Sequence, residues 1–208
     1  MKGMRMMNKK GALIVVSGPS GCGKGTVLAE ILKDENCMYS VSATTRAPRP
    51  GETDGVNYHF ITREEFEKEI ASGGMLEYAE YCGNYYGTPL APIDRGLNEG
   101  KNVILEIEVK GAANVRRLRP DAVLVFILPP SLAELRRRLE KRGTETAEVV
   151  DRRIARASEE IKEAEKYDYI MVNGELDEAV SDLKAIIKAA GLSCPINKYR
   201  IDEVLENA

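Results

Sequence analysis

The sequence has few of the side chains from which metal clusters and disulfide frameworks are built. It contains one histidine and 4 cysteines in 208 residues, and no two cysteines stand in Cys-x-x-Cys spacing. This scarcity excludes the common Cys/His zinc site and favours free thiols in a reducing, cytoplasmic compartment.

Long apolar runs and an excess of charge of one sign are also missing. No stretch approaches the ~18 apolar residues of a membrane span, and the apolar run after the basic, Met-rich residues 1–10 is too short for a signal peptide. Lys and Arg total 30 against 33 Asp and Glu, a net charge of -3, so no global field attracts a polyanion such as DNA. We therefore expect a flexible tail over residues 1–10, no membrane or nucleic-acid partner, and phosphate binding that is local.

The most informative stretch is a glycine-rich segment between an apolar run and a helical pattern. The apolar residues 13–16 are typical of a strand buried on both faces. The glycines that follow let the backbone turn, so that its N–H groups and the N-terminus of a helix starting near Lys24 point at a polyphosphate. The predicted nucleotide-binding loop consists of Gly18, Pro19, Ser20, Gly21, Cys22, Gly23, Lys24, Gly25 and Thr26.

Two positions of this loop have alternative interpretations. Gly25 stands where a Ser or Thr usually binds Mg²⁺, and Thr26 follows one place later. Thr26 is therefore the candidate metal ligand, either directly or through water. Cys22 could be a nucleophile, as in phosphatase loops in which an Arg follows the Cys after five residues. Leu28 occupies that place here, which favours Cys22 as a small loop residue.

The rest of the chain alternates between helical and strand patterns. After the loop, the spacing of apolar residues predicts a helix that ends near residues 34–36, and Ser131 with Glu134 has the form of a capping box that begins another. Strands are predicted at residues 103–108, 122–128 and 169–172. Such alternation predicts an α/β fold with a mainly parallel sheet flanked by helices.

Residues 39–88 interrupt this alternation, because short β-prone pieces alternate there with Pro and Gly, and we interpret them as an inserted subdomain. Within it, Arg46 and Arg49 stand on a stiff extended segment, and rigid guanidinium forks suit bidentate phosphate binding. Tyr58 and Tyr86 can add hydroxyl donors. Alone, each of these residues is more typical of a structural or exposed place, but beside a phosphate-binding loop they indicate a second phosphate site.

An arginine-dense region lies between the last two predicted strands. From Arg136 to Arg156 there are eight basic residues against four acidic ones. Solvated helix faces with i,i+4 ion pairs account for most such side chains. However, Gly143 and the polar residues after it break the helical pattern into a hinged hairpin. Such a hairpin over residues 134–156 suits a lid that closes on phosphates.

Five motifs together resemble those of guanylate kinases. They are the loop at residues 18–24, Ser42-Ala43-Thr44-Thr45-Arg46-Ala47-Pro48-Arg49-Pro50-Gly51-Glu52, Gly55-Val56-Asn57-Tyr58, Gly83-Asn84-Tyr85-Tyr86-Gly87 and Arg142-Gly143-Thr144-Glu145-Thr146. The resemblance extends from about residue 11 to residue 190. It implies a P-loop kinase core at residues 11–38 and 89–208, a GMP-binding insertion at 39–88, and transfer of the γ-phosphoryl group of ATP, bound with Mg²⁺, to GMP.

The resemblance also implies roles for individual side chains. The catalytic side chains would be Lys24, Arg46, Arg138, Arg142 and Arg153. Asn173 would lie near the adenine. The GMP-binding side chains would be Ser42, Arg46, Arg49, Glu52, Tyr58, Glu77, Tyr86, Thr88 and Glu108. An ionised Glu77 would accept hydrogen bonds from the donor edge of guanine while Ser42 and Thr88 donate to O6, and adenine would leave these groups unpaired.

The chain departs from the usual family pattern at three positions. Many relatives have Asp in place of Glu108, Gln in place of Lys110 and Ser in place of Thr88, although the donor and acceptor types at Glu108 and Thr88 are preserved. A guanylate-kinase-like interaction module would keep the fold but generally lacks an intact P-loop. A kinase for another nucleoside monophosphate is disfavoured by the guanine-side carboxylates. Both a monomer and a homo-oligomer are compatible with the sequence.

Overall fold

Five parallel strands form the central sheet of the computed structural model, which describes residues 10–141 and 146–206. The strands are β1 (Leu13–Ser17), β2 (Cys37–Tyr39), β7 (Asn102–Glu106), β8 (Val123–Leu128) and β9 (Tyr169–Val172), in the order β2-β7-β1-β8-β9. Every neighbouring pair in this order is parallel. The predicted mainly parallel sheet is confirmed, and the carboxyl ends of its strands lie at one edge, where α/β proteins bind ligands.

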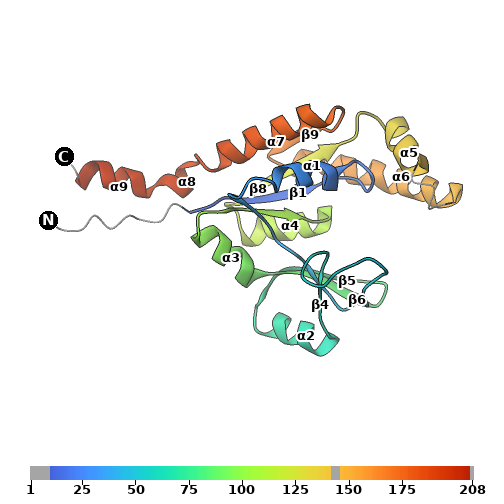
Figure 1. Cartoon of the computed structure of the whole chain (residues 1–208), viewed down its shortest axis with the longest axis horizontal. Coiled ribbons are helices and arrows are strands. Elements are labelled where there is room, and N and C mark those ends of the chain that lie inside the picture. The colour runs from blue at the N-terminus through green and yellow to red at the C-terminus, as the bar shows by residue number, and fades with distance from the viewer. Residues whose placement is uncertain (1–9, 142–145, 207–208) are drawn as a thin grey trace.

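Helices cover both faces of the central sheet, and each face has its own apolar core. The covering helices include α1 (Lys24–Ile31), α3 (Leu90–Asn98), α4 (Val109–Leu118) and α7 (Leu176–Ala190). Ile14 and Val16 of β1 pack in the cluster that contains residues of α1 and α7, whereas Leu13 and Val15 pack in the cluster that contains residues of α3 and α4. Figure 1 shows these helix pairs on opposite sides of the sheet. The continuous apolar run of β1 follows from burial on both faces.

A second sheet of four strands carries the inserted segment. Its strands are β3 (Ala43–Thr44), β4 (His59–Phe60), β5 (Met75–Tyr81) and β6 (Asn84–Pro89), in the order β4-β3-β6-β5. The helix α2 (Arg63–Ala71) begins with a complete capping box between Thr62 and Glu65. Phe66 of α2 is fully buried and stacks on Tyr85 of β6, with 5.1 Å between the ring centroids. This contact fixes α2 against the insertion sheet.

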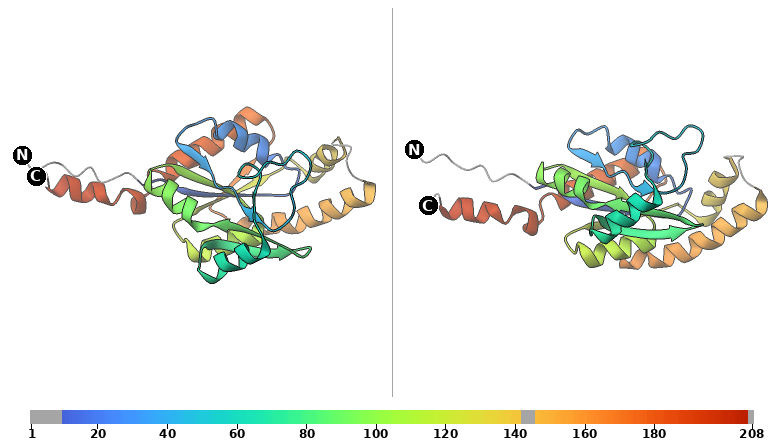
Figure 2. Two further views of the ribbon diagram at one scale, coloured as in Figure 1. Left: turned by 60° about the horizontal axis from the view of Figure 1, so that its bottom comes forward. Right: turned by 90° about the horizontal axis from the view of Figure 1, so that it is seen from below.

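Two helices after β8, α5 (Leu132–Lys141) and α6 (Ala147–Lys162), lie at the end of the molecule opposite the C-terminus (Figure 2). The short 3₁₀ helix η1 (Glu163–Lys166) leads from α6 into β9. After α7 the chain forms α8 (Cys194–Asn197) and α9 (Tyr199–Glu206), which extend away from the body of the molecule. No residue of α9 is buried.

The prediction of a strand over residues 103–108 is wrong at its end, and a helix escaped the sequence analysis. The strand β7 ends at Glu106, and Glu108 is the N-cap residue of α4. Only Ala112 and Val115 of α4 are buried. Its other apolar residues, Val109, Ala113 and Leu118, are not buried and do not continue one apolar stripe, so the periodic signal is weak.

Two predicted helix boundaries also differ from the structure. The helix after the loop ends at Ile31, not near residues 34–36, because the chain turns there to enter β2. At the start of α5, the Ser131 hydroxyl accepts a hydrogen bond from the Glu134 N–H at 3.0 Å, as predicted. The other hydrogen bond of that capping box, from the Ser131 N–H to the Glu134 carboxylate, is wrongly predicted. The Glu134 carboxylate accepts hydrogen bonds from Arg137 and Arg138 instead.

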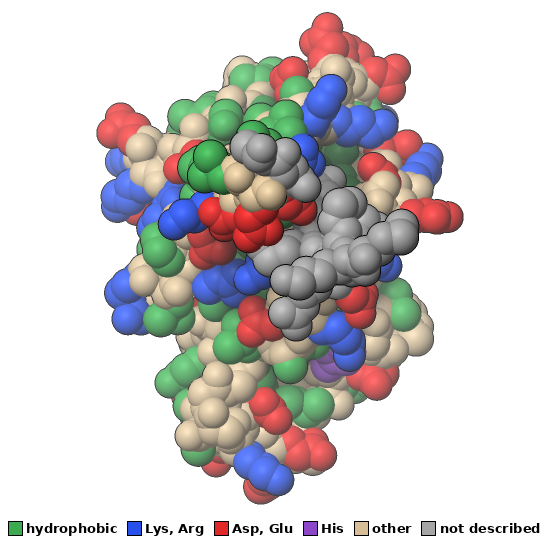
Figure 3. Space-filling model, turned by 90° about the vertical axis from the view of Figure 1, so that its left-hand side faces the viewer, with side chains coloured by type: hydrophobic (Ala, Val, Ile, Leu, Met, Phe, Trp, Pro, Cys, Tyr) green, Lys and Arg blue, Asp and Glu red, His purple; other side chains and the backbone are tan. Residues whose placement is uncertain are grey.

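The outer surface of the described residues carries charges of both signs. On the face in Figure 3, acidic and basic side chains are interspersed, consistent with the small net charge of -3. Among the helices that the structure describes, none combines the length and the apolar character that crossing a bilayer requires.

Candidate active site

The loop between β1 and α1 has the geometry of an anion site at a helix N-terminus. Gly21 and Gly23 have φ angles of 92° and 93°, in the left-handed region that favours glycine. Gly23 is the N-cap residue of α1, so the first N–H groups of this helix point toward the loop. A Cβ atom at Gly23 would lie only 2.3 Å from Nδ2 of Asn173. Glycine is therefore required at this position by backbone conformation and by space.

The Lys24 side chain turns back along this loop. Its Nζ atom donates to the carbonyl oxygens of Gly18 at 2.7 Å and Pro19 at 3.2 Å. The same atom lies 4.0 Å from Oε1 of Glu106, the last residue of β7. The loop thus holds a positive charge, with a carboxylate beside it.

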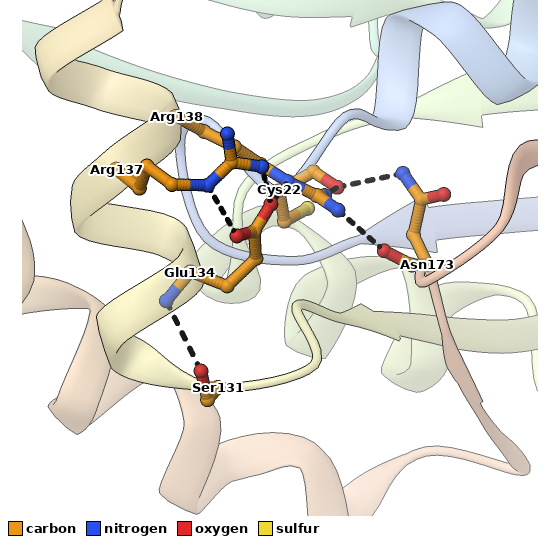
Figure 4. Close-up of polar contacts among 6 residues, drawn as sticks. All are labelled: Cys22, Ser131, Glu134, Arg137, Arg138 and Asn173. Atoms are coloured by element: carbon orange, nitrogen blue, oxygen red, sulfur yellow. Dashed lines mark hydrogen bonds and ion pairs between the residues drawn. The ribbon is translucent and has the colours of Figure 1, made fainter.

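Three acceptors hold the Arg138 guanidinium against the loop (Figure 4). Its Nε donates to Oε1 of Glu134 at 2.8 Å, Nη1 donates to the Cys22 carbonyl at 3.2 Å, and Nη2 donates to the Asn173 carbonyl at 3.0 Å. The Asn173 side chain itself donates from Nδ2 to the Cys22 carbonyl at 2.8 Å. These contacts join α5, the loop and the end of β9 at one point.

A pocket of about 500 Å³ opens beside this junction. It is lined by Gly21, Gly23, Thr26, Arg138, Lys141, Asn173, Gly174 and Leu176. Such a volume, with a mixed apolar and polar lining, suits a small ligand such as a nucleotide base. Asn173 is buried at the wall of this pocket, and Thr26 is exposed at the first turn of α1.

In the insertion, several groups fix the guanidinium of Arg46. Its Nη2 donates to Oε1 of Glu52 at 2.9 Å and its Nη1 to the Ala47 carbonyl at 2.6 Å. The guanidinium lies 5.6 Å from the ring centroid of Tyr58, and the Tyr58 and Tyr86 rings meet edge to face at 6.0 Å. The structure therefore brings Arg46, Glu52, Tyr58 and Tyr86 together in one cluster.

Glu52 connects this cluster to the second predicted arginine. Its Oε2 accepts a hydrogen bond from the backbone N–H of Arg49 at 2.7 Å. The Arg49 N–H and the Arg46 guanidinium hold the pKa of Glu52 below its ordinary value, so the carboxylate stays ionised. The Arg49 side chain is exposed.

Glu77 and Thr88 stand opposite each other on β5 and β6. The Thr88 hydroxyl donates to Oε1 of Glu77 at 2.6 Å, so its single proton serves this carboxylate and not the guanine O6 to which it was predicted to donate. Burial raises the pKa of Glu77, and the charge of Glu108 acts in the same direction against the hydrogen bond from Thr88. Ser42 directly precedes β3 and is half-buried, and its carbonyl accepts the His59 N–H at 2.8 Å.

Helix α6 contacts both the loop and Glu108. Nη1 of Arg153 lies 3.4 Å from the Ser20 hydroxyl oxygen. Nη2 of Arg156 lies 2.8 Å from Oε2 of Glu108, whose side chain is 76% exposed. Arg142, the remaining predicted lid arginine, lies outside the described residues.

The buried thiol of Cys22 is unsuited to nucleophilic chemistry. The residue is fully buried in the larger apolar core, and this burial raises the pKa of its thiol despite the nearby Lys24. The nucleophile in thiol chemistry is the thiolate, which a raised pKa disfavours. The structure therefore supports Cys22 as a small loop residue.

Two carboxylates of the site were missed in the sequence analysis. Glu106 stands beside Val16 in the register of β7 on β1, and this places it next to the loop. Hydrogen bonds from Arg137 and Arg138 lower the pKa of Glu134 to about 2, so it stays ionised and keeps Arg138 in place. Glu106 lies inside the strand predicted at residues 103–108, so its place at the end of β7 was not apparent from the sequence. The capping-box interpretation concealed the role of Glu134.

These features define a class of protein. They are the parts of a P-loop nucleoside monophosphate kinase. The parallel sheet has a lysine-bearing phosphate loop after β1, the second sheet has an arginine cluster, and a helix pair carries further arginines.

Comparison with known proteins identifies the family. The family model for guanylate kinase matches residues 10–190. The guanylate kinase of Latilactobacillus sakei is 52% identical over 198 residues, which cover 93% of this chain and 98% of that one. The guanylate kinase of Lactococcus lactis is 54% identical over 201 residues, which cover 96% of this chain and 95% of that one. The crystal structure of guanylate kinase from Anaplasma phagocytophilum superposes with a TM-score of 0.72 at 35% identity, covering 90% of each chain. The chain belongs to the guanylate kinase family and is an ATP:GMP phosphotransferase.

Proposed function

We propose that the γ-phosphoryl group of ATP passes directly, in line, to a phosphate oxygen of GMP between two anion sites. ATP would lie in the loop, with its phosphates at Lys24 and its adenine in the pocket beside Asn173. The GMP phosphate would lie at the cluster of Arg46, Arg49, Tyr58 and Tyr86, with Glu52 supporting the arginines. Residues 39–88 would thus form the GMP-binding insertion of a core made of residues 11–38 and 89–208, except that Tyr39 belongs to β2 of the central sheet and Pro89 to β6 of the second sheet.

The observation that carries this proposal is the Glu106 carboxylate, which lies beside the loop lysine and acts electrostatically on Tyr58 of the second anion site. This carboxylate lies 4.0 Å from Nζ of Lys24 in the loop. In the insertion, burial raises the pKa of Tyr58, with Tyr86, Glu52 and Glu106 acting in the same direction against Arg46. One carboxylate therefore acts on a group of each site, and transfer would require the two bound phosphates to meet there.

The guanine base would be read by Glu77, Thr88, Ser42 and Glu108. Guanine presents N1–H and an exocyclic amine as donors, and carboxylates are acceptor-only groups when ionised. Thr88 orients Glu77 through its hydroxyl, which donates at 2.6 Å. A base that presents the opposite pattern would leave these groups unpaired, and sites of this kind discriminate strongly.

The donors beside the loop fit Mg²⁺, which prefers hard oxygen ligands. Thr26 offers a hydroxyl, directly or through water, and Glu106 offers a carboxylate, whereas Gly25 has no side chain to contribute. When bound with ATP, Mg²⁺ supplies neutralisation of the β- and γ-phosphate charge.

Positioning and charge account for the chemistry that we propose. A phosphate oxygen of GMP is already a competent nucleophile, so no general base is assigned. Lys24 and Arg46 would hold the two phosphates, and Arg138, Arg142 and Arg153 would close on the ATP side as a lid over residues 134–156. Closure would exclude water from the transfer step.

A coupled assay of ADP release with GMP, AMP, CMP and UMP tests the proposed base reading. We expect efficient turnover with GMP alone among the four acceptors. Comparable kcat/KM for AMP would contradict the assigned roles of Glu77 and Thr88, and no turnover with any acceptor would favour an interaction module.

A further inference from the structure

An ion pair connects the lid helix to the guanine side of the site. Nη2 of Arg156, on α6, lies 2.8 Å from Oε2 of Glu108, the N-cap residue of α4. Nε of the same guanidinium donates to Oε1 of Glu160, one turn along α6, at 2.7 Å. The guanidinium is thus held by its own helix while it reaches across to α4.

The part of α6 that carries Arg156 is anchored to the core. Val150 and Ala157 are 2% exposed and belong to the larger apolar cluster. Arg153, one turn before Arg156, approaches the Ser20 hydroxyl of the loop at 3.4 Å. One packed helix therefore offers one arginine to the loop and another to Glu108.

Glu108 needs such a partner if its carboxylate is to read a base. Its backbone is fixed, because its carbonyl accepts the Ala112 N–H at 3.0 Å, but its side chain is 76% exposed. A long exposed side chain loses rotamer freedom when a ligand orders it, and a partner that holds it in advance reduces this loss. Arg156 also offsets the repulsion between Glu108 and Glu77, two carboxylates that act on each other electrostatically.

We propose that Arg156 is a positioning residue for GMP: it holds the Glu108 carboxylate in place for guanine without itself touching the substrates. This inference rests on the proposed guanine-reading role of Glu108. Removal of Arg156 then weakens GMP binding through Glu108 and leaves ATP binding unchanged.

Steady-state kinetics of Arg156→Ala, Glu108→Gln and the double variant test the proposal. Exposed ion pairs contribute modestly, so we expect Arg156→Ala to raise KM for GMP roughly two- to fivefold, with kcat and KM for ATP unchanged. In the Glu108→Gln background the same substitution should have no further effect, because the group on which it acts is already changed. Arg156→Lys keeps the charge and should recover part of the loss.

A charge-removing control on the same helix is Lys162→Ala. Lys162 pairs with Glu159 at 2.7 Å on the exposed face and should leave both KM values unchanged. Thermal denaturation confirms that each variant is folded at the assay temperature. A loss of similar size in Lys162→Ala would assign the effect to the helix charge and overturn the proposal.

The remaining outcomes separate this inference from the proposed function. If Glu108→Gln raises KM for GMP but Arg156→Ala does not, or if the Arg156 effect persists in full in the Glu108→Gln background, the positioning role is refuted and the guanine-reading role stands. If Glu108→Gln leaves KM for GMP unchanged, Glu108 does not read guanine and the positioning role fails with it.

Discussion

The Asn173 side chain donates a hydrogen bond from Nδ2 to the Cys22 carbonyl at 2.8 Å, across a separation of 151 residues. Arg138 reaches the same carbonyl and also the Asn173 carbonyl. The end of β9 thereby fixes the middle of the phosphate loop. A loop with this constraint presents its N–H groups in a preorganised arrangement, which is what electrostatic stabilisation of a phosphoryl group needs.

Asn173→Asp should loosen the loop and weaken ATP binding. The carboxylate keeps the shape of the amide but places an acceptor where the amide donates to the Cys22 carbonyl, and a buried acceptor that faces no donor costs about 1–3 kcal/mol. We expect a lower free energy of unfolding by that amount and a KM for ATP raised roughly tenfold. Chemical denaturation and initial rates at varied ATP measure the two effects.

Asn197→Asp is the matched control for this prediction. The Asn197 amide also donates to backbone carbonyls, those of Gly191 and Ser193, but in the C-terminal segment. It should lose stability without any change in KM for ATP. An equal rise of KM for ATP in both variants would show that general destabilisation, and not the loop, is responsible.

Lys24→Ala should reduce kcat by roughly a hundredfold or more, because this loop lysine neutralises phosphate charge as it develops. The side chain donates hydrogen bonds to the loop carbonyls of Gly18 and Pro19 at 2.7 and 3.2 Å and takes no part in the apolar cores, so the fold should survive. Lys33→Ala, which removes an exposed lysine paired with Glu30, serves as the control for charge. A folded Lys24 variant with near wild-type kcat would rule out the assigned role.

Gly25→Ala and Gly23→Ala should have opposite effects on stability. A Cβ atom at Gly25 meets nothing within 4 Å, and alanine in a helix is favoured over glycine by about 0.5–1 kcal/mol. Gly23 has φ of 93°, and a Cβ atom there would lie 2.3 Å from Asn173, so alanine should destabilise the fold. Thermal melts of the two variants decide this, and a lower Tm for Gly25→Ala would contradict it.

The local parts of this site could be predicted from the sequence, and the long-range contacts could not. The strand β1 and the loop after it are encoded in neighbouring residues, so their patterns are visible in the chain. The pair of Arg156 and Glu108 joins positions 48 residues apart on two helices, one of which has too few buried residues to be recognised. Glu134 was misread because its i,i+4 partner Arg138 outcompetes the helix N-terminus for its carboxylate.

Glu77 should make the stability of the protein depend on pH in a particular direction. Burial raises the pKa of this carboxyl in the folded state above its ordinary value of 4.5. The folded state therefore binds the proton more tightly than the unfolded state, and ionisation of Glu77 costs stability at neutral pH. Glu77→Gln should be more stable than the wild type at pH 7, and the difference should shrink as the pH falls from the raised pKa toward 4.5. A difference that is constant over this range would show that Glu77 is not its source.

Glu77→Gln should at the same time weaken the use of GMP. The carboxamide must turn a donor toward the donor edge of guanine or lose part of its contact, whereas the ionised carboxylate only accepts. Losing a charge-assisted hydrogen bond costs about 1.5–3 kcal/mol, so kcat/KM for GMP should fall roughly ten- to a hundredfold.

KM for ATP should hardly change, because Glu77 lies on β5 of the insertion and not beside the loop. Activity on AMP should rise little, since the Ser42 hydroxyl remains as a donor suited to O6 of guanine and not to the amine of adenine. A variant that kept its GMP efficiency, or that lost ATP and GMP binding equally, would show that Glu77 does not read the base.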